Sequence, residues 1–354
     1  MTSSPPTHPK RAGSDVDVIV VTYNSRENFA RLKAALEQQT VSHRLLVIDN
    51  ASKPEQRPTP RDLPEGAVII QMDENLGFAK ANNHGVTLCS GKYIALLNPD
   101  AFPNPDWLER LIEAAERTPQ AACFGSTQIA DENQGLLDGL GDCYSIAGVP
   151  WRGGYHWPAN TPLTEGEVFS PCAAAALYRI DAWRAVGGFD ESFFCYCEDV
   201  DLGFRLRLAG ATCIQVKRAV VRHIGGASSG SRSYFSVFHG TRNRMWTFVK
   251  NMPTPLLWIA APAHAVMTLA FMVMSLFRGT AAPTWAGVFA GLRGLPEILR
   301  VRKRVQAERV VNVADLSRML SWSPLEMASR APVVRTPLSV KRNAPAHGAE
   351  LQRP

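Results

Sequence analysis

The sequence predicts an α/β fold with a mixed, mostly parallel sheet and an apolar helical appendage toward the C-terminus. Short apolar runs alternate with helical patterns from Asp15 onward, which is typical of stacked β/α units. A stretch from Leu256 to Phe277 then carries no charge, and basic residues gather after it. At 354 residues and 45% hydrophobic composition, the chain can bury one large core and a smaller additional unit.

Four apolar runs are expected to form strands of the sheet, because their length and composition are typical of strands buried on both faces. They lie at residues 16–21, 45–49, 67–72 and 93–97. Asn24 and Glu27 have the spacing of a capping box, so we expect a helix to begin at Asn24. A second helix is expected after Pro105, where four apolar residues share one helical face: Trp107, Leu108, Leu111 and Ile112.

The composition divides the chain into four parts. Residues 1–14 are polar and proline-rich and are expected to be disordered. Residues 15–250 form the main domain, within which residues 131–167 are expected to form loops over a cleft. Residues 251–310 are predicted to be an apolar and basic helical segment that associates with a membrane, and residues 311–354 a mostly disordered basic tail.

Two features indicate a reducing compartment. The N-terminal segment lacks the apolar core of a secretory signal, so we expect the N-terminus to stay in the cytoplasm. The seven cysteines form an odd set without a CxxC pair, which argues against a disulfide framework and against a structural zinc site.

The positive charge of the chain is concentrated near its end. From Arg278 onward, 13 Lys and Arg outnumber 5 Asp and Glu, although the net charge of the whole chain is only +6. A surplus confined to the region after an apolar stretch indicates anionic lipid headgroups rather than nucleic acid, with a solvated tail as the alternative. Because Pro262 and His264 interrupt the uncharged stretch, we expect an in-plane or re-entrant hairpin rather than a full span.

Polar clusters follow each of the four apolar runs: TYNS, DNAS, DENLGFAKANNHG and NPDA. Ligands of open α/β sheets bind at the carboxyl ends of the strands, so we expect these clusters to meet at one edge. Thr22, Tyr23, Asn24 and Asp49 are suited to hydrogen bonds with a nucleoside. Each of these residues alone would more often form a turn or a helix cap, but four clusters in register favour a binding site.

Asp100 follows the fourth apolar run and is a candidate metal ligand, because carboxylate oxygen suits hard divalent cations. A diphosphate leaving group needs its negative charge neutralised, and a metal held at this place would do so. The alternative is that the NPD sequence forms only an Asx-type turn.

A second acidic cluster lies in EDVDLGFRLRLAG, where Glu198, Asp199 and Asp201 repel one another unless a cation or a proton relieves them. Asp201 and Arg205 are spaced to pair on a helix, so we expect Asp201 to be structural. Glu198 or Asp199 is then left as a general base. His223 follows an apolar segment and would complete the metal site, with an ordinary polar contact as the alternative.

The order and spacing of these motifs resemble family 2 glycosyltransferases, particularly the rhamnosyltransferase-like and galactofuranosyltransferase-like branch. The resemblance runs from residue 16 to residue 250 and rests on VVTYNS, VIDNAS, ENLGFAKANNHG, LLNPDA, GGFDESFFCYCEDVDLGFRLRLAG and His223. It implies the GT-A fold, which is Rossmann-like and binds nucleotide-diphospho-sugars. For most members it also implies inversion of the anomeric centre in a single displacement.

The resemblance implies roles for single residues that match the motifs. The nucleoside of the donor would be held by Thr22, Tyr23, Asn24 and Asp49. The pocket beside the diphosphate and the sugar would be shaped by Asn75, Gly77, Asn82 and Asn98. Asn98 stands where the DxD motif of the family has its first acid.

The catalytic and metal-binding roles follow in the same way. Asp100 matches the last acid of the DxD motif, and Asp199 matches the acid of the ED pair that serves as the base, with Glu198 beside it. His223 lies 24 residues after Asp199, where related transferases have a metal-ligating histidine. The metal implied is Mg2+ or Mn2+.

The HGTRNRMW segment, with Arg242 and Arg244, also resembles a feature at the end of the family's catalytic domain. Arginines suit phosphate oxygens, so Arg242 is counted among the donor-binding residues. The alternative is a membrane-surface anchor. The QxxRW motif of processive synthases is absent from the sequence, so we expect the transfer of one or a few sugars.

The sequence therefore predicts an inverting glycosyltransferase with a dTDP- or UDP-linked donor, rhamnose being favoured by the resemblance. A polyprenyl-diphosphate-linked glycan is the expected acceptor, and the cytoplasmic face of the plasma membrane is the expected location, with peripheral or monotopic attachment. The alternatives are a non-catalytic sugar-nucleotide or glycan-binding module and a sugar nucleotidyltransferase. The prediction requires Asp100 and Asp199 to share one cavity.

Overall fold

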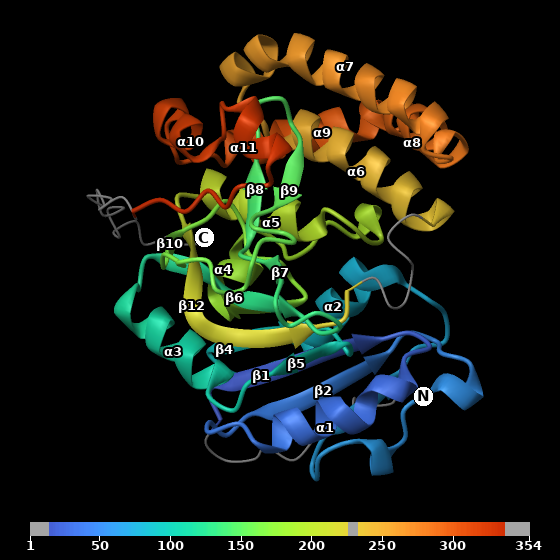
Figure 1. Cartoon of the computed structure of the whole chain (residues 1–354), viewed down its shortest axis with the longest axis vertical. Helices are drawn as coiled ribbons and strands as arrows, with labels where there is room; N and C mark the ends of the chain where they lie inside the picture. Colours follow the sequence, from blue (N-terminus) through green and yellow to red (C-terminus); the bar gives the residue numbers. More distant parts are fainter. Residues whose placement is uncertain (1–13, 226–232, 337–354) are drawn as a thin grey trace, which may run out of the picture.

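The computed structural model describes residues 14–225 and 233–336. An α/β unit built around one large sheet forms one end of the molecule, and a group of helices from the C-terminal part of the chain covers the other end (Figure 1). The predicted disorder of residues 1–13 and 337–354 lies outside the described residues.

Within these described ranges the strands are β1 (Val16–Thr22), β2 (Arg44–Asp49), β3 (Val68–Gln71), β4 (Tyr93–Leu97), β5 (Ala101–Pro103), β6 (Ala121–Ala130), β7 (Leu137–Gly139), β8 (Asp142–Tyr144), β9 (Pro150–Arg152), β10 (Gly166–Glu167), β11 (Ala175–Arg179) and β12 (Thr212–His223). The α-helices are α1 (Phe29–Glu37), α2 (Gly77–Thr87), α3 (Trp107–Arg117), α4 (Ile180–Ala185), α5 (Glu198–Leu208), α6 (Tyr234–Asn251), α7 (Thr254–Phe277), α8 (Ala281–Arg293), α9 (Leu295–Ala307), α10 (Val313–Met319) and α11 (Pro324–Ala328). Short 3-10 helices are η1 (Arg26–Asn28), η2 (Pro54–Gln56), η3 (Pro60–Asp62) and η4 (Glu191–Phe193).

The main sheet is mixed, as the sequence predicts. Its strand order among the described residues is β10-β12-β6-β11-β4-β1-β2-β3, with β5 paired to β12 and β7 paired to β6. The four predicted strands form the adjacent parallel set β4-β1-β2-β3, while β11 runs antiparallel between β4 and β6. Thr22 pairs with Asp49, so the polar clusters after β1 and β2 begin at the same edge of the sheet.

The side chains of β1 alternate between two apolar layers, because successive residues of a strand point to opposite faces. Val16, Val18 and Val20 pack with α1 and α3 on one face of the sheet. Ile19 and Val21 pack with α2, α4 and α5 on the other. Burial on both faces explains why residues 18–21 of the strand form a continuous apolar run in the sequence.

Of the two helices predicted beside the first strands, one begins where expected. The helix after Pro105 is confirmed as α3. The helix start at Asn24 is wrong, because α1 begins at Phe29 and Asn24 has a positive φ of 53°. The Asn24 side chain accepts a hydrogen bond from the N–H of Lys53 at 2.9 Å, and its own N–H donates to Ser52 Oγ at 2.8 Å. Asn24 therefore ties two loops together instead of capping a helix.

The segment 131–167 contains short strands as well as the predicted loops. β7 extends the main sheet beside β6, whereas β8 and β9 form a separate antiparallel hairpin. This hairpin brings Trp151 and Arg152 to the wall of a cavity beside the sheet edge.

The prediction of a mostly disordered tail is wrong for residues 311–336, which contain α10 and α11. Residues 321–335, here called the C-terminal strap, run beside the β8–β9 hairpin. The N–H of Ser321 donates to the Tyr144 carbonyl at 2.9 Å, and the indole N–H of Trp151 donates to the Ala331 carbonyl at 3.0 Å. The partners of the strap lie more than a hundred residues away, so no local pattern reveals that it folds.

Helices α6 to α9 form the appendage. α6 and α8 pack closely, because a Cβ added at Gly287 would lie 2.7 Å from the Phe238 carbonyl oxygen. α7 and α8 pack as a helical hairpin, and α7 runs along the outer edge of the molecule (Figure 1). By length and composition, α7 is able to cross a membrane. Its outer face exposes apolar side chains that include Trp258, Ile259, Val266, Leu269, Leu276 and Phe277.

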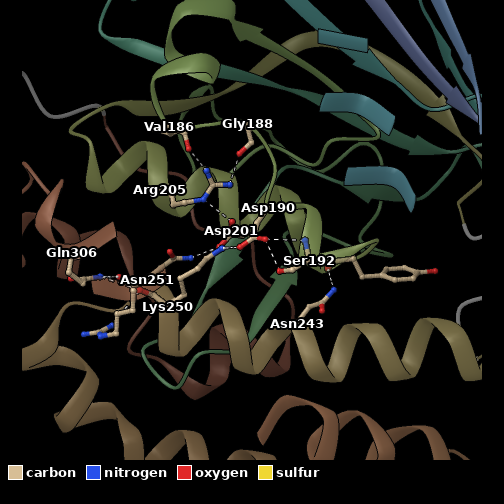
Figure 2. Close-up of polar contacts among 12 residues, drawn as sticks. Val186, Gly188, Asp190, Ser192, Asp201, Arg205, Asn243, Lys250, Asn251 and Gln306 are labelled. Atoms are coloured by element: carbon tan, nitrogen blue, oxygen red, sulfur yellow. Dashed lines mark hydrogen bonds and ion pairs between the residues drawn. The ribbon is translucent and has the colours of Figure 1, made fainter. Parts of the chain in front are cut away.

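A buried ion-pair network joins α6 to α5 (Figure 2). Lys250 Nζ lies 2.5 Å from Asp190 Oδ2 and 2.7 Å from Asp201 Oδ1, and Lys250 and Asp201 are fully buried. Asp201 also accepts from Arg205 Nε at 2.8 Å, so the predicted pair of Asp201 and Arg205 is confirmed. Burial alone would raise the pKa of Asp190, but the Lys250 charge together with hydrogen bonds from Lys250 and Ser192 outweighs burial and lowers that pKa to about 2.

We expect the Lys250→Met variant to lose about 3–5 kcal/mol of unfolding free energy, because Asp190 loses its lysine partner and the fully buried Asp201 keeps only Arg205 as a cationic partner. The lowered pKa of Asp190 means that its contribution is complete above pH ~4 and is lost as the pH falls toward ~2. Urea unfolding of the wild type and of Lys250→Met at pH 7 and near pH 3 measures the difference between their unfolding free energies. This difference should be smaller at the lower pH. Arg300→Met, which breaks an exposed pair with Glu297, is the control and should change stability by less than about 1 kcal/mol.

Candidate active site

A cavity of about 830 Å³ lies where the carboxyl ends of β1, β2 and β4 meet the start of α5. Its lining residues come from segments spread between Val21 and Gly240. Those that the sequence predicted are Tyr23, Asn75, Gly77, Asn98, Asp100, Glu198, Asp199 and His223. Asp100 and Asp199 thus share one cavity, as the prediction required.

A carboxamide pair organises the wall at the ends of β2 and α2. Asn50 Nδ2 donates to Asn75 Oδ1 at 2.8 Å, and Asn50 Oδ1 accepts from the N–H of Leu76 at 2.9 Å. Asn75 Oδ1 also accepts from the N–H of Gly77 at 2.9 Å. These bonds hold the first turn of α2 beside Tyr23, which is 42% exposed and free to contact a flat ring.

Gly77 is required by its surroundings. Its φ is +79°, and a Cβ added there would lie 2.6 Å from the ring and from the carbonyl oxygen of Phe194. The loop that precedes α5 therefore packs directly against the start of α2. Phe194 lies five residues before Asp199, so the start of α2 contacts the loop that leads to the Asp199 carboxylate.

Five predicted donor-binding residues do not line the cavity: Thr22, Asn24, Asp49, Asn82 and Arg242. Asp49 is fully buried, and its carboxylate accepts from Arg57 Nε at 2.9 Å and from the N–H of Ser52 at 3.2 Å. It holds the loop after β2 in place. Thr22 is also fully buried, at the end of β1.

The other predicted residues outside the cavity have structural contacts as well. Asn82 Nδ2 donates to the Phe78 carbonyl within α2 at 2.9 Å. Arg242 donates to the carbonyls of Ser192 and Phe193, and its guanidinium lies over the Trp246 ring. These contacts place Arg242 beside the loop before α5 rather than in the cavity.

Arg244 is buried between helices and does not face the cavity. Its guanidinium donates to Thr268 Oγ1 of α7 at 3.0 Å, and burial lowers its pKa to about 10. Arg244 therefore fixes α6 to the apolar helix.

Asp100 and His223 lie side by side because β5 pairs antiparallel with β12, with His223 opposite Ala101. His223 Nε2 is 3.3 Å from Asp100 Oδ1 and otherwise has no partner among the described residues. His223 Nδ1 is 2.7 Å from Asp138 Oδ2, which also lies 2.6 Å from an Arg152 nitrogen. Burial alone would lower the pKa of His223, but the two carboxylates outweigh it and raise the pKa to about 9.

Three further carboxyl groups, those of Asp142, Glu198 and Asp199, also line the cavity. Asp199 Oδ2 accepts from the N–H of Ala173 at 3.2 Å, and Oδ1 accepts from the N–H of Val200 at 2.8 Å. Glu198 is buried, and its Oε2 has no hydrogen-bond partner within the described residues. Burial raises the pKa values of Glu198, Asp199 and Asp142, and the Asp199 charge raises those of Glu198 and Asp142 further.

The sequence analysis missed Asn50, Asp138, Asp142, Trp151 and Arg152. Asn50 directly follows Asp49 in the quoted DNAS cluster, and its position at the strand end was the available signal. The other four lie in the segment 131–167, which lacks periodicity. Because β7, β8 and β9 are only three residues long each, no pattern marks which of their side chains face the cavity.

The sequence profile of glycosyl transferase family 2 matches residues 17–185. Among characterised proteins, the chain is 30% identical over 250 residues to N-acetylglucosaminyl-diphospho-decaprenol L-rhamnosyltransferase of Mycobacterium tuberculosis. This alignment covers 60% of the chain and 77% of the relative.

Solved structures with the same fold share less sequence. A mannosyltransferase from Pyrobaculum calidifontis, in complex with GDP-Man and Mn2+, has a TM-score of 0.50 at 14% identity, covering 88% of this chain and 85% of its own. Residues 1–349 of TarS from S. aureus give a TM-score of 0.51 at 14% identity, covering 86% and 89%. Both likenesses concern the fold, which the sheet order and the site at its edge also support. The profile match and the rhamnosyltransferase relative establish that the chain is a glycosyltransferase that belongs to family 2.

Proposed function

We propose that the enzyme transfers a sugar, with rhamnose favoured, from a dTDP- or UDP-linked donor to a hydroxyl of a polyprenyl-diphosphate-linked glycan, with inversion at the anomeric carbon. The observation that carries this proposal is the single cavity that Asp100, His223 and Asp199 line together. The name of the mycobacterial relative supports both the rhamnosyl donor and the lipid-linked acceptor.

Asp199 is the proposed base. The acceptor oxygen bonds to the anomeric carbon while the bond from that carbon to the diphosphate oxygen breaks, and the hydroxyl proton passes to an Asp199 carboxylate oxygen. Backbone N–H groups of Ala173 and Val200 fix the orientation of this carboxylate. Orientation matters because proton transfer needs the base within hydrogen-bond reach of the hydroxyl.

Asp100 and His223 are suited to hold Mg2+ or Mn2+. His223 Nε2 and Asp100 Oδ1 face each other at the cavity, and Asp138 orients the imidazole through Nδ1. A carboxylate behind a metal-ligating histidine is a common arrangement in metal sites. The described residues contain no group of three or more His, Cys, Asp or Glu that is placed to hold a metal, so donor phosphate oxygens would supply further ligands. When bound, the cation neutralises the charge that develops on the departing diphosphate.

The appendage is proposed to seat the enzyme on the cytoplasmic face of the plasma membrane as a peripheral or monotopic protein. The apolar outer face of α7 is largely exposed, because only 17% of the most apolar 18-residue stretch of this helix is buried. Exposed basic residues that suit anionic headgroups accompany it: Arg278, Arg293, Arg300, Lys303 and Arg304. A polyprenyl acceptor would meet the cavity at such a surface.

Replacement of Asp199 by Asn tests the assignment of the base. We expect turnover to fall by about 10²- to 10⁴-fold while nucleoside diphosphate binding is kept, because a positioned base contributes about that much. The measurement is nucleoside diphosphate release over a panel of dTDP- and UDP-sugars with a membrane extract as the acceptor. The matched control is Glu198→Gln, which neutralises the adjacent carboxyl. A larger loss in Glu198→Gln than in Asp199→Asn would move the role of base to Glu198.

The raised pKa of Asp199 also predicts the pH dependence of turnover. The base must be ionised to accept a proton, so kcat should fall as the pH drops through a pKa above the ordinary Asp value of about 4. A wild-type kcat that stays constant down to pH ~4 would contradict this role for Asp199.

Metal binding is tested on the protein directly. We expect His223→Ala to weaken Mn2+ binding by about 10- to 100-fold, as loss of a ligand or of its support does in other sites. Electron paramagnetic resonance of free Mn2+, titrated with protein in the presence of UDP, measures this without turnover. His84→Ala, on α2 outside the cavity lining, is the control. Equal Mn2+ binding by all three proteins would remove His223 from the site.

The membrane surface is tested with vesicles of phosphatidylcholine and phosphatidylglycerol. Trp258 and Phe277 are 73% and 85% exposed, and burial of one such side chain is worth about 1.5–3 kcal/mol. The double variant Trp258→Ser/Phe277→Ser should therefore lower co-sedimentation affinity by about tenfold or more. Val310→Ser, which alters an apolar side chain that is 77% exposed outside α7, should not. Unchanged binding of the double variant would mean that α7 is not the contact surface.

A further inference from the structure

The loop that leads into the proposed base has an unusual backbone. Phe194, Tyr196 and Cys197 have φ values of 63°, 70° and 64°, although none of them is glycine. Each such residue costs on the order of 1 kcal/mol or more, and it persists only where the surroundings hold it. The next residues are Glu198 and Asp199, at the first turn of α5. The position of the base therefore depends on what holds this loop.

One side chain of α6 makes hydrogen bonds to three carbonyls of this loop. Asn243 is fully buried, and its Nδ2 lies 2.9, 2.8 and 2.7 Å from the carbonyl oxygens of Phe193, Cys195 and Tyr196, so its two N–H groups are shared among three acceptors. The irregular backbone of the loop gives these carbonyls no helix or strand ladder to join, and Asn243 supplies donors in its place. Arg242, the preceding residue, adds bonds to the start of the same loop.

The position of α6 is itself fixed at both faces. On the side of the catalytic domain, Lys250 bridges Asp190 before the loop and Asp201 after it (Figure 2). On the opposite side, α6 packs on α8 and α9, with the close approach at Gly287 already described. The loop is therefore clamped by a helix that belongs equally to the appendage.

We propose that Asn243 is a positioning residue for the transfer reaction, which sets the Asp199 carboxylate by fixing the 193–197 loop against α6. This inference rests on the proposed function and extends it, because it makes the appendage part of the catalytic unit as well as a membrane contact. A displacement of about 1 Å at a reacting group is enough to lower a rate by about 10²-fold.

The test compares Asn243→Ala and Asn243→Ser with a matched control. Gln306→Ala also removes a carboxamide that donates to backbone carbonyls of α6, those of Lys250 and Asn251, but away from the loop. We expect Asn243→Ala to lower kcat by about 10- to 100-fold, with UDP affinity changed by less than about threefold. Asn243→Ser, which keeps one donor, should be intermediate and carries the same test if the alanine variant does not fold. Gln306→Ala should keep kcat within about twofold.

A second measurement is independent of turnover. Hydrogen–deuterium exchange of the backbone amides of residues 194–199 should be about tenfold faster or more in the Asn243 variants than in wild type and in Gln306→Ala, because the loop opens more often. The inference would be overturned by unchanged protection of this loop, or by an unchanged kcat, in both Asn243 variants. A wild-type enzyme that releases no nucleoside diphosphate from any donor would instead overturn the proposed function, and the exchange result would still decide the role of Asn243.

Discussion

The antiparallel pairing of two short stretches, β5 and the end of β12, is the contact on which the site depends. β5 is three residues long, yet its register sets Asp100 beside His223 although the two are far apart in the sequence. The N–H of Ile224 also donates to the Asp100 carbonyl at 3.1 Å, which extends the pairing past the strand. The backbone thus brings the two residues together, and Asp138 then fixes the orientation of the His223 imidazole.

The cavity concentrates charges that a stable core would avoid. Burial raises the pKa values of Glu198, Asp199 and Asp142, and the Asp199 charge raises those of Glu198 and Asp142 further, so their ionised forms are unfavourable where they lie. The Lys250 network, by contrast, matches its charges closely and lies outside the cavity. The molecule therefore keeps its electrostatic strain at the site of chemistry and its matched charges where helices must be joined.

The sequence predicts the sheet and the shared cavity because both follow from apolar runs and the residues that end them. Tyr23 and Asp100 are found at the cavity for this reason, whereas Asp199 is found from the acidic cluster at the start of α5. Asp49 has the same kind of position, but Arg57 turns its carboxylate into the loop, and no pattern in the sequence indicates that pairing. Asp142 and Arg152 were missed because they lie on three-residue strands, and the C-terminal strap was missed because its partners are distant. Local patterns thus locate the strand ends, whereas long-range contacts decide where each side chain points.

The C-terminal strap has a consequence for biosynthesis. It supports the hairpin that carries Trp151 and Arg152. At the margin of the sheet, the backbone of Arg335 also forms an antiparallel bridge with the backbone of Glu167. A ribosome delivers these partners in order, so the wall of the cavity stays incomplete while residues 321–335 are still in the exit tunnel. The growing polypeptide can thus form its sheet early yet gain a finished cavity only after residues 321–335 have followed α7 out of the ribosome.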